Sequence, residues 1–212
     1  MAFIYPKLTF PGRGCTLPLL KSKKDLPGMN HSSHLLSIHR LVWIALMAAL
    51  TAVGAMISIP VLPFSPVPIS LQTLFVLLAG LILGPKGGAL AMLLYIMAGC
   101  LGLPVFVGGK SGIAALLGPT GGFLIGFVPS AIISGLAKST PLRPYPVILV
   151  YCAIATVVTL ALGTAQLAYL LHISVGKALA VGVVPFLPGA VLKCLGAAFI
   201  YRFLAARRLI PA

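Results

Sequence analysis

The chain has 212 residues, of which 60% are hydrophobic and only 8% are charged, and its mean hydropathy is +1.14. A soluble domain carries roughly a quarter charged residues, so this composition excludes an ordinary soluble protein and indicates one membrane-embedded bundle. Fifteen Lys and Arg stand against one acidic residue, Asp25. Carboxylate-based catalysis and transport driven by protons or sodium therefore lack their usual groups, and we predict that the chain is not an enzyme.

Residues 1–40 are polar and basic, and they contain no apolar stretch and cleavage site of a signal peptide. We predict a cytoplasmic tail over 1–40. The position of Met29 just before the first apolar run favours a translation start there, with residues 1–28 as an extension to the natural protein. His31 and His34 have i, i+3 spacing, but no further ligand completes a site, so no metal is expected.

Six apolar segments follow the tail, separated by the Gly and Pro residues expected where helices end. They cover 41–60, 69–83, 87–103, 119–137, 146–171 and 181–201. We therefore predict an all-α membrane protein with six transmembrane helices over 41–207 and a short cytoplasmic tail over 208–212.

The positions of the cations predict the orientation of these six helices. With a cytoplasmic amino terminus, twelve of the fifteen Lys and Arg fall on the cytoplasmic side, and only Lys110, Lys177 and Lys193 do not. This bias follows the positive-inside rule, so both termini are expected to be cytoplasmic. Cations placed between apolar runs also argue against a nucleic-acid partner.

Lys193 is the first candidate for a binding residue because it lies within the sixth apolar segment. If that helix begins near Pro188, Lys193 lies about one and a half turns, ~7 Å, below its outer end. An unpaired cation in hydrocarbon is costly, and with no Asp or Glu on another helix its partner can be a carboxylate on a ligand. The alternative is that the side chain extends to the outer interface.

Uncharged polar groups are predicted near the same side of the membrane. The proline-rich loop over 60–70 leads to Gln72, and Gln166 lies near the outer end of the fifth segment. The loop over 103–123 is rich in glycine and is expected either to cover a pocket or to be an ordinary flexible loop. A cation with several neutral hydrogen-bonding groups suits a small ligand that has a carboxylate and a polar, uncharged ring.

The first segment contains alanines at four-residue spacing, including Ala45 and Ala49, and a further alanine at Ala52. Small residues at this spacing let helices pack closely. They predict either packing within the chain or contact with a partner membrane subunit.

Four stretches in this order resemble the BioY family, the biotin-binding S components of energy-coupling-factor (ECF) transporters. They are 66–74 (PVPISLQTL), 78–86 (LAGLILGPK), 102–106 (GLPVF) and 118–122 (GPTGG). The resemblance implies a six-helix S-component fold in a bacterial plasma membrane. It also implies a biotin pocket near the outer side, capped by the first and third outer loops.

The resemblance further implies partners and site residues. A transmembrane coupling subunit and a pair of ATPases would supply energy, although some members act alone, and Ala45, Ala49 and Ala52 would contact the coupling subunit. Expected ligand contacts come from five residues: Lys193, Gln72, Phe106, Gly121 and Gln166. Biotin would be the transported ligand, with no resident cofactor.

One position departs from the family pattern. Lys193 occupies the lysine of the family's Pro-Gly-Asp-x-x-Lys motif, but Ala190 stands where the aspartate is expected. Gln166 or Gln72 would then compensate, or the chain binds more weakly or takes another ligand, or the substitution is engineered. The alternatives to biotin uptake are an S component for a different small vitamin and a structural membrane subunit without its own ligand.

Overall fold

The computed structural model describes residues 38–60, 65–138, 144–207 and 209–210. The predicted tail over 1–40, apart from its last three residues, lies outside this part of the chain, and so does the proposed start at Met29. Three residues of the predicted tail over 208–212 lie outside it as well.

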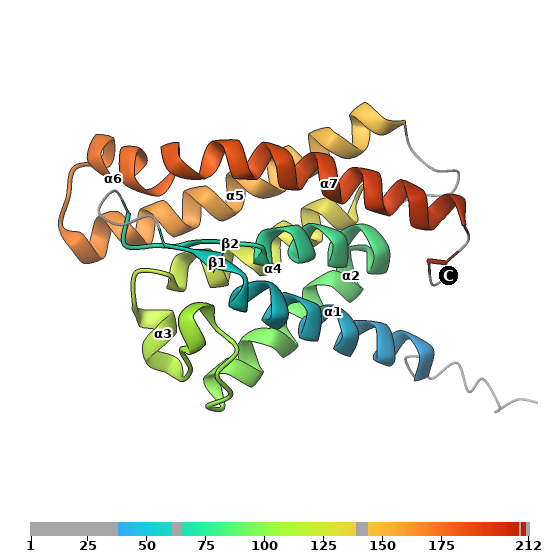
Figure 1. The fold of residues 1–212 in the computed structure, drawn as a ribbon, viewed down its shortest axis with the longest axis horizontal. Coiled ribbons are helices and arrows are strands. Elements are labelled where there is room, and N and C mark those ends of the chain that lie inside the picture. Colours follow the sequence, from blue (N-terminus) through green and yellow to red (C-terminus); the bar gives the residue numbers. More distant parts are fainter. Residues whose placement is uncertain (1–37, 61–64, 139–143, 208, 211–212) are drawn as a thin grey trace, which may run out of the picture. The chain divides into compact units, whose positions relative to one another are not determined.

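The described chain is helical, with one short pair of strands (Figure 1). Its elements, in order, are α1 (Ile38–Met56), β1 (Ser58–Ile59), β2 (Ile69–Ser70), α2 (Gln72–Cys100), the 3-10 helix η1 (Val107–Gly109), α3 (Ile113–Leu117), α4 (Gly121–Gly135), α5 (Tyr145–Leu171), α6 (Val175–Gly182), the 3-10 helix η2 (Val184–Phe186) and α7 (Leu187–Ala206). The β1–β2 pair, α3 and α6 lie in the left half of Figure 1, and the carboxyl terminus lies at the other end.

Helix α2 is in fact two helical arms, 72–83 and 85–100, with a break between them. Gly84 has φ 78° and ψ 179°, a conformation open almost only to glycine, and Pro85 follows it. A Cβ on Gly88 would lie 2.8 Å from the Cα of Gly80, so the second arm folds back along the first. The prediction of six helices is confirmed: they are α1, the two arms of α2, α4, α5 and α7.

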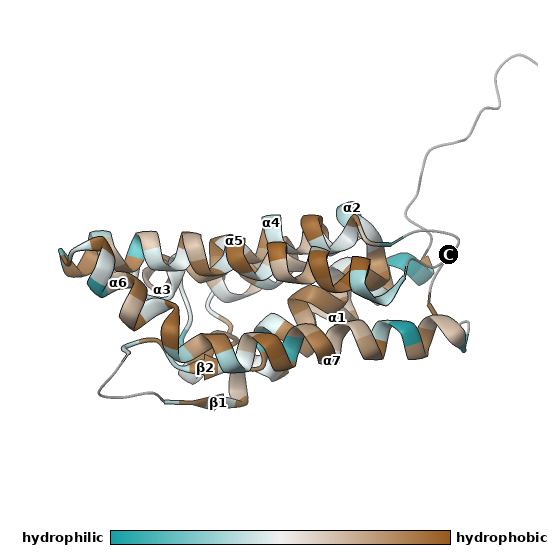
Figure 2. Ribbon diagram, turned by 90° about the horizontal axis from the view of Figure 1, so that it is seen from above, coloured by the Kyte–Doolittle hydropathy of each residue, from teal (hydrophilic) through white to brown (hydrophobic). Residues whose placement is uncertain are grey.

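Length and apolar composition suit these helices to a membrane. By length and composition, α1, α5 and the run from α6 into α7 are each long and apolar enough to cross it. Helix α2 has this length only as the sum of its two arms, and α4 is a shorter apolar helix. Large apolar side chains point outward, including Leu192 (70% exposed) and Phe199 (66% exposed). Apolar residues predominate along α5 and α7 in Figure 2, as expected for helices whose outer faces meet lipid.

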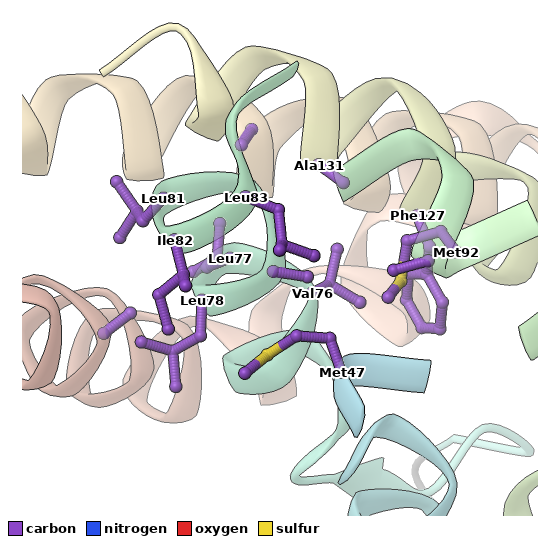
Figure 3. Close-up of a cluster of buried hydrophobic side chains, with 14 of the residues drawn as sticks. Met47, Val76, Leu77, Leu78, Leu81, Ile82, Leu83, Met92, Phe127 and Ala131 are labelled. Atoms are coloured by element: carbon purple, nitrogen blue, oxygen red, sulfur yellow. The ribbon is translucent and has the colours of Figure 1, made fainter. Parts of the chain in front are cut away.

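The core lies around the first arm of α2. Its buried side chains come from several helices, including Met47 of α1, Leu81 of α2 and Phe127 of α4, and Figure 3 shows how they gather around this arm. On α1, the buried face carries Ile44 and Met47 and leaves the predicted partner-contact residues Ala45 and Ala49 exposed, with Ala52 half-buried.

Candidate ligand-binding site

A cavity opens where the first arm of α2 meets α4, α5 and α7. It encloses about 680 Å³ not filled by protein atoms, part of it open to solvent. The residues that line it are Val67, Pro68, Ser70, Gln72, Thr73, Phe106, Val107, Thr120, Phe123, Leu124, Phe127, Thr156, Thr159, Leu160, Phe186, Ala190 and Lys193.

Local hydrogen bonding sets the position of the first arm at this cavity. Strands β1 and β2 are antiparallel, with Ser58 opposite Ser70, and β2 contacts α1. The N–H of Leu71 donates to the carbonyls of Gly54 and Ile57, both at 3.1 Å. Ser70 and the start of α2 are therefore held against the end of α1.

A series of hydrogen bonds crosses the polar side of the cavity, and it passes through two different groups of Ser70. The Lys193 ammonium donates to the Ser70 carbonyl at 2.5 Å, and the Ser70 hydroxyl donates to Oε1 of Gln72 at 2.9 Å. Nε2 of Gln72 donates to the Tyr95 hydroxyl at 2.5 Å, which donates to the Val105 carbonyl at 3.0 Å. The series links α7, β2, both arms of α2 and the loop after α2.

The directions of the bonds from Val105 back to Ser70 follow from the Val105 end. A carbonyl only accepts, so the Tyr95 hydroxyl must give its hydrogen to Val105 and accept one from Gln72. The amide of Gln72 is thereby oriented with its oxygen toward Ser70. One N–H of Gln72 and two N–H groups of Lys193 remain for another acceptor.

The loop after α2 reaches the cavity through Phe106, which is only 2% exposed. Its ring lies edge-to-face on Tyr95, with centroids 5.6 Å apart and planes at 83°. A Cβ on Gly99 would collide with this ring, so the glycine makes room for it. The N–H of Gly112 donates to the Gly99 carbonyl at 2.7 Å and holds the far end of the loop to the same helix.

Aromatic side chains form the apolar side of the cavity. Phe123 of α4 and Phe186 of η2 are stacked, with centroids 5.9 Å apart and planes at 30°, and Phe127 lies one turn further along α4. A Cβ on Gly163 would overlap the Phe123 ring, so this glycine of α5 allows α4 and α5 to come together there.

Two hydroxyls on α5 add polar groups that sequence reasoning did not select. Thr156 donates to the Cys152 carbonyl at 2.8 Å, and Thr159 shares a 2.5 Å hydrogen bond with Ser130. Thr156 and Thr159 both line the cavity. Because their hydroxyl hydrogens are used in these hydrogen bonds, the two hydroxyls can mainly accept hydrogen bonds from a ligand. Threonines in an apolar helical run are common, and nothing in the sequence marked these two or Tyr95.

The structure brings three of the five predicted ligand contacts to the cavity: Lys193, Gln72 and Phe106. It places Gln166 beside the wall instead, where Nε2 donates to the carbonyls of Leu116 at 2.8 Å and Gly118 at 2.9 Å. Gly121 lies at the same point, because a Cβ on it would collide with the Leu116 carbonyl and approach Gln166.

Charge in the cavity is carried by Lys193 alone among the described lining residues, and Ala190 lines the wall one turn before it on α7. In the described part of the chain, no group of three His, Cys, Asp or Glu residues is arranged to hold a metal ion. The site thus offers a cation, a few neutral polar groups and an aromatic wall.

A six-helix membrane bundle whose cavity offers one cation, neutral polar groups and an aromatic wall has the features of a membrane subunit that binds a small solute. A crystal structure at 2.1 Å of the S-component for biotin from an ECF-type ABC transporter has the same fold. Its TM-score is 0.75 at 28% sequence identity, over 82% of this chain and 94% of that one. The sequence model of the BioY family matches residues 29–211, and the chain belongs to the BioY family.

Two relatives show the extent of this similarity. The biotin transporter BioY of Thermotoga maritima is 38% identical over 163 residues, which cover 77% of this chain and 94% of that protein. A probable biotin transporter BioY of Pyrococcus horikoshii is 53% identical over 95 residues, which cover 45% of this chain and 57% of that protein. The resemblance inferred from the four sequence stretches is confirmed.

Proposed function

We propose that this chain is a biotin-binding membrane subunit that mediates biotin uptake, with energy supplied by partner ATPase subunits. The observation that carries the proposal is the Lys193 ammonium in a largely apolar cavity of a BioY-family chain. Relatives named as biotin transporters, and a similar structure named as the S-component for biotin, support the choice of ligand.

Biotin's chemistry matches the groups in the cavity. Its carboxylate would accept hydrogen bonds from Lys193, which has two N–H groups beyond the one given to Ser70. The ureido ring both donates and accepts, and it would meet Gln72, Thr156 and Thr159. The apolar bicycle and the aliphatic chain would pack on the aromatic wall, which includes Phe106.

Calorimetry on the purified full chain tests this assignment. We expect tight biotin binding by the wild type and an affinity at least about 30-fold lower in Lys193→Met, because removing the charged partner leaves the carboxylate desolvated and unpaired. Neutral biotinamide should bind similarly to both. Lys177→Met is the matched control, since Lys177 is exposed on α6 and does not line the cavity. If Lys193→Met binds biotin as the wild type does, Lys193 is not the carboxylate partner.

A second candidate, an S component for a different small vitamin, is supported by Ala190. This residue lines the cavity, so its side chain contributes no charge or hydrogen bond where the family motif has aspartate. Competition binding with a panel of vitamins would separate the candidates. Biotin binding that appears only in Ala190→Asp would favour another vitamin as the natural ligand.

The proposal also includes partners and orientation. Exposed Ala45 and Ala49 on α1 would allow close approach of a coupling subunit's helix, and large residues there should prevent co-purification with such a subunit without lowering biotin affinity. A chain that transports biotin alone would overturn this part.

Both termini and the Gly84–Pro85 break are proposed to face the cytoplasm, and no catalytic residue is assigned.

A further inference from the structure

A second cavity adjoins the first one, on the side of the β1–β2 pair and of the loop that follows α2. It encloses about 760 Å³, part of it open solvent. The residues that line it are Ser58, Pro60, Ser65, Pro66, Pro68, Val107, Gly108, Lys110 and Thr120. Pro68, Val107 and Thr120 also line the first cavity, so the two spaces share a wall.

A tight turn over 106–110 forms part of this shared wall. The N–H of Phe106 donates to the Lys110 carbonyl at 3.1 Å, and the N–H of Gly109 donates to the Phe106 carbonyl at 3.0 Å. Gly108 and Gly109, with φ of 74° and 71°, allow the chain to reverse this sharply. Phe106 lines the first cavity, called the inner cavity from here on. Lys110 lines the second, called the outer cavity, and Val107 lines both.

Each of the two cavities is lined by one cation among the described residues. Lys110 is the only charged side chain among the described residues of the outer cavity, and Lys193 has that position in the inner one. The remaining outer lining consists of proline, serine, threonine, valine and glycine. Asp25, the chain's one acidic residue, lies outside the described residues, so no acidic side chain from the described part offsets either cation.

We propose that the outer cavity is a capture site, where Lys110 attracts the carboxylate of an anionic ligand before the ligand passes the 106–110 turn to Lys193. The inference rests on the proposed function. A cation in a concave surface raises the local concentration of an anion and speeds its association, and salt weakens this effect. A ligand that has moved past the turn no longer contacts Lys110, so the equilibrium dissociation constant should not depend on Lys110. The association and dissociation rate constants should therefore change by the same factor.

Stopped-flow kinetics on the purified full chain test the proposal, with biotin and biotinamide as probes. We expect Lys110→Gln to lower the association rate constant for biotin by about 3- to 10-fold at about 20 mM salt, and much less at about 500 mM. The dissociation rate constant of biotin should fall by the same factor, so that its equilibrium dissociation constant stays within about twofold of the wild type. Both rate constants for neutral biotinamide should also stay within about twofold. Lys177→Gln, which removes an exposed cation of α6 outside both cavities, should have little effect.

Four results would overturn the capture site. An unchanged association rate would show that Lys110 does not attract the ligand, and an equal loss in Lys177→Gln would show a general effect of surface charge. Slower association of biotinamide would mean that the variant had disturbed the turn. A higher equilibrium dissociation constant for biotin would mean that Lys110 holds the bound carboxylate. A wild type that binds no biotin refutes the proposed function as well, whereas any of the four results with a binding wild type refutes the capture site alone.

Discussion

At the scale of single residues, the Tyr95 hydroxyl has the most consequential position outside the cavity lining. It accepts from Gln72 and donates to Val105, so it joins a cavity residue to the loop that carries Phe106. Gln72 is buried, and an amide without this partner could rotate to other orientations. Tyr95 therefore acts on a ligand through Gln72 and the loop, as a positioning residue.

Removing this hydroxyl should weaken binding without removing a ligand contact. We expect Tyr95→Phe to bind biotin about 10-fold more weakly, because an N–H of Gln72 and the carbonyl of Val105 both lose their partner while the ring packing on Phe106 stays. Calorimetry would measure the affinity. Tyr201→Phe, a change at a buried tyrosine of α7 outside the cavity lining, should leave it unchanged.

A double-mutant cycle separates positioning from general destabilisation. If Tyr95 acts through Gln72, then Tyr95→Phe should cost little further affinity in a Gln72→Ala background, so the two effects will not add. Additive losses would show that Tyr95 affects binding by another route.

At the scale of elements, small residues decide how the hairpin of α2 packs against α4. A Cβ on Gly80 would collide with the Ala131 carbonyl and the Ser134 hydroxyl of α4, and a Cβ on Gly135 would lie 2.5 Å from the nitrogen of Pro85. The helices touch backbone to backbone, as is usual for membrane helices that associate through small residues. The arm that begins at Gln72 is held in place by this contact.

A side chain at Gly80 should therefore separate these helices. We expect Gly80→Val to destabilise the protein by about 2–3 kcal/mol, since the collision involves backbone atoms that cannot move aside. Thermal unfolding in detergent should show an apparent Tm lower by roughly 5–10 °C. Gly176→Val is the control, because a Cβ there meets nothing within 4 Å. Equal stability of the two variants would contradict the close packing.

The break in α2 depends on a backbone conformation. Gly84 has a positive φ with an extended ψ, which is strained for any residue with a Cβ. Gly84→Ala should cost about 1–3 kcal/mol, although a Cβ there would meet only the Lys138 side chain, at 3.5 Å. The same thermal measurement checks this, and an unchanged Tm would show that the turn tolerates another conformation.

At the scale of the whole molecule, the cations separate toward the two ends of the helices. Arg40, Lys86, Lys138, Arg202 and Arg207 lie toward the end with the Gly84–Pro85 break. Burial and the nearby Arg40 charge lower the pKa of Lys138, which shows that α1 begins close to where α4 ends. Lys110, Lys177 and Lys193 belong to the end with the cavities.

This separation predicts the orientation in the membrane. In a background without other reactive cysteines, Lys177→Cys should react with an impermeant maleimide added to intact cells, whereas Lys86→Cys should react only after the membrane is opened. The reverse pattern would place the cavities on the cytoplasmic side and contradict uptake from outside.

Much of the fold could be predicted because a helix that crosses a bilayer requires a run of apolar residues, which is visible in the sequence. Apolar runs separated by Gly and Pro correctly indicated six helices, including the break at Gly84. The break could be predicted because glycine and proline change the backbone conformation at their own positions in the sequence. The last apolar segment was drawn from Val181 and so included the end of α6 and all of η2. The helix start near Pro188 that was used to place Lys193 agrees with α7, which begins at Leu187.

Among the predicted residues that line the cavity, only Lys193 was unusual in its own segment, and Phe106 was expected through the family resemblance. Lys193 stood out as a cation in an apolar run, and the structure places it in the cavity. Tyr95, Thr156 and Thr159 did not stand out, because tyrosine and threonine are ordinary in such helices. Gln166 and Gln72 are both amides near outer helix ends, and the sequence did not distinguish them. In the structure Gln166 donates to two loop carbonyls, whereas Gln72 lines the cavity.

The sequence by itself thus determined the membrane environment, the helices, the family and the expected ligand class, since each depends on composition or on residues near one another in the chain. Only the tertiary structure decided which polar groups meet. Lys193 reaches Ser70 across 123 positions of sequence, and Tyr95 joins Gln72 to Val105. Hydrogen bonds are short and directional, so a partner far along the chain is selected by how the helices pack and leaves no local pattern.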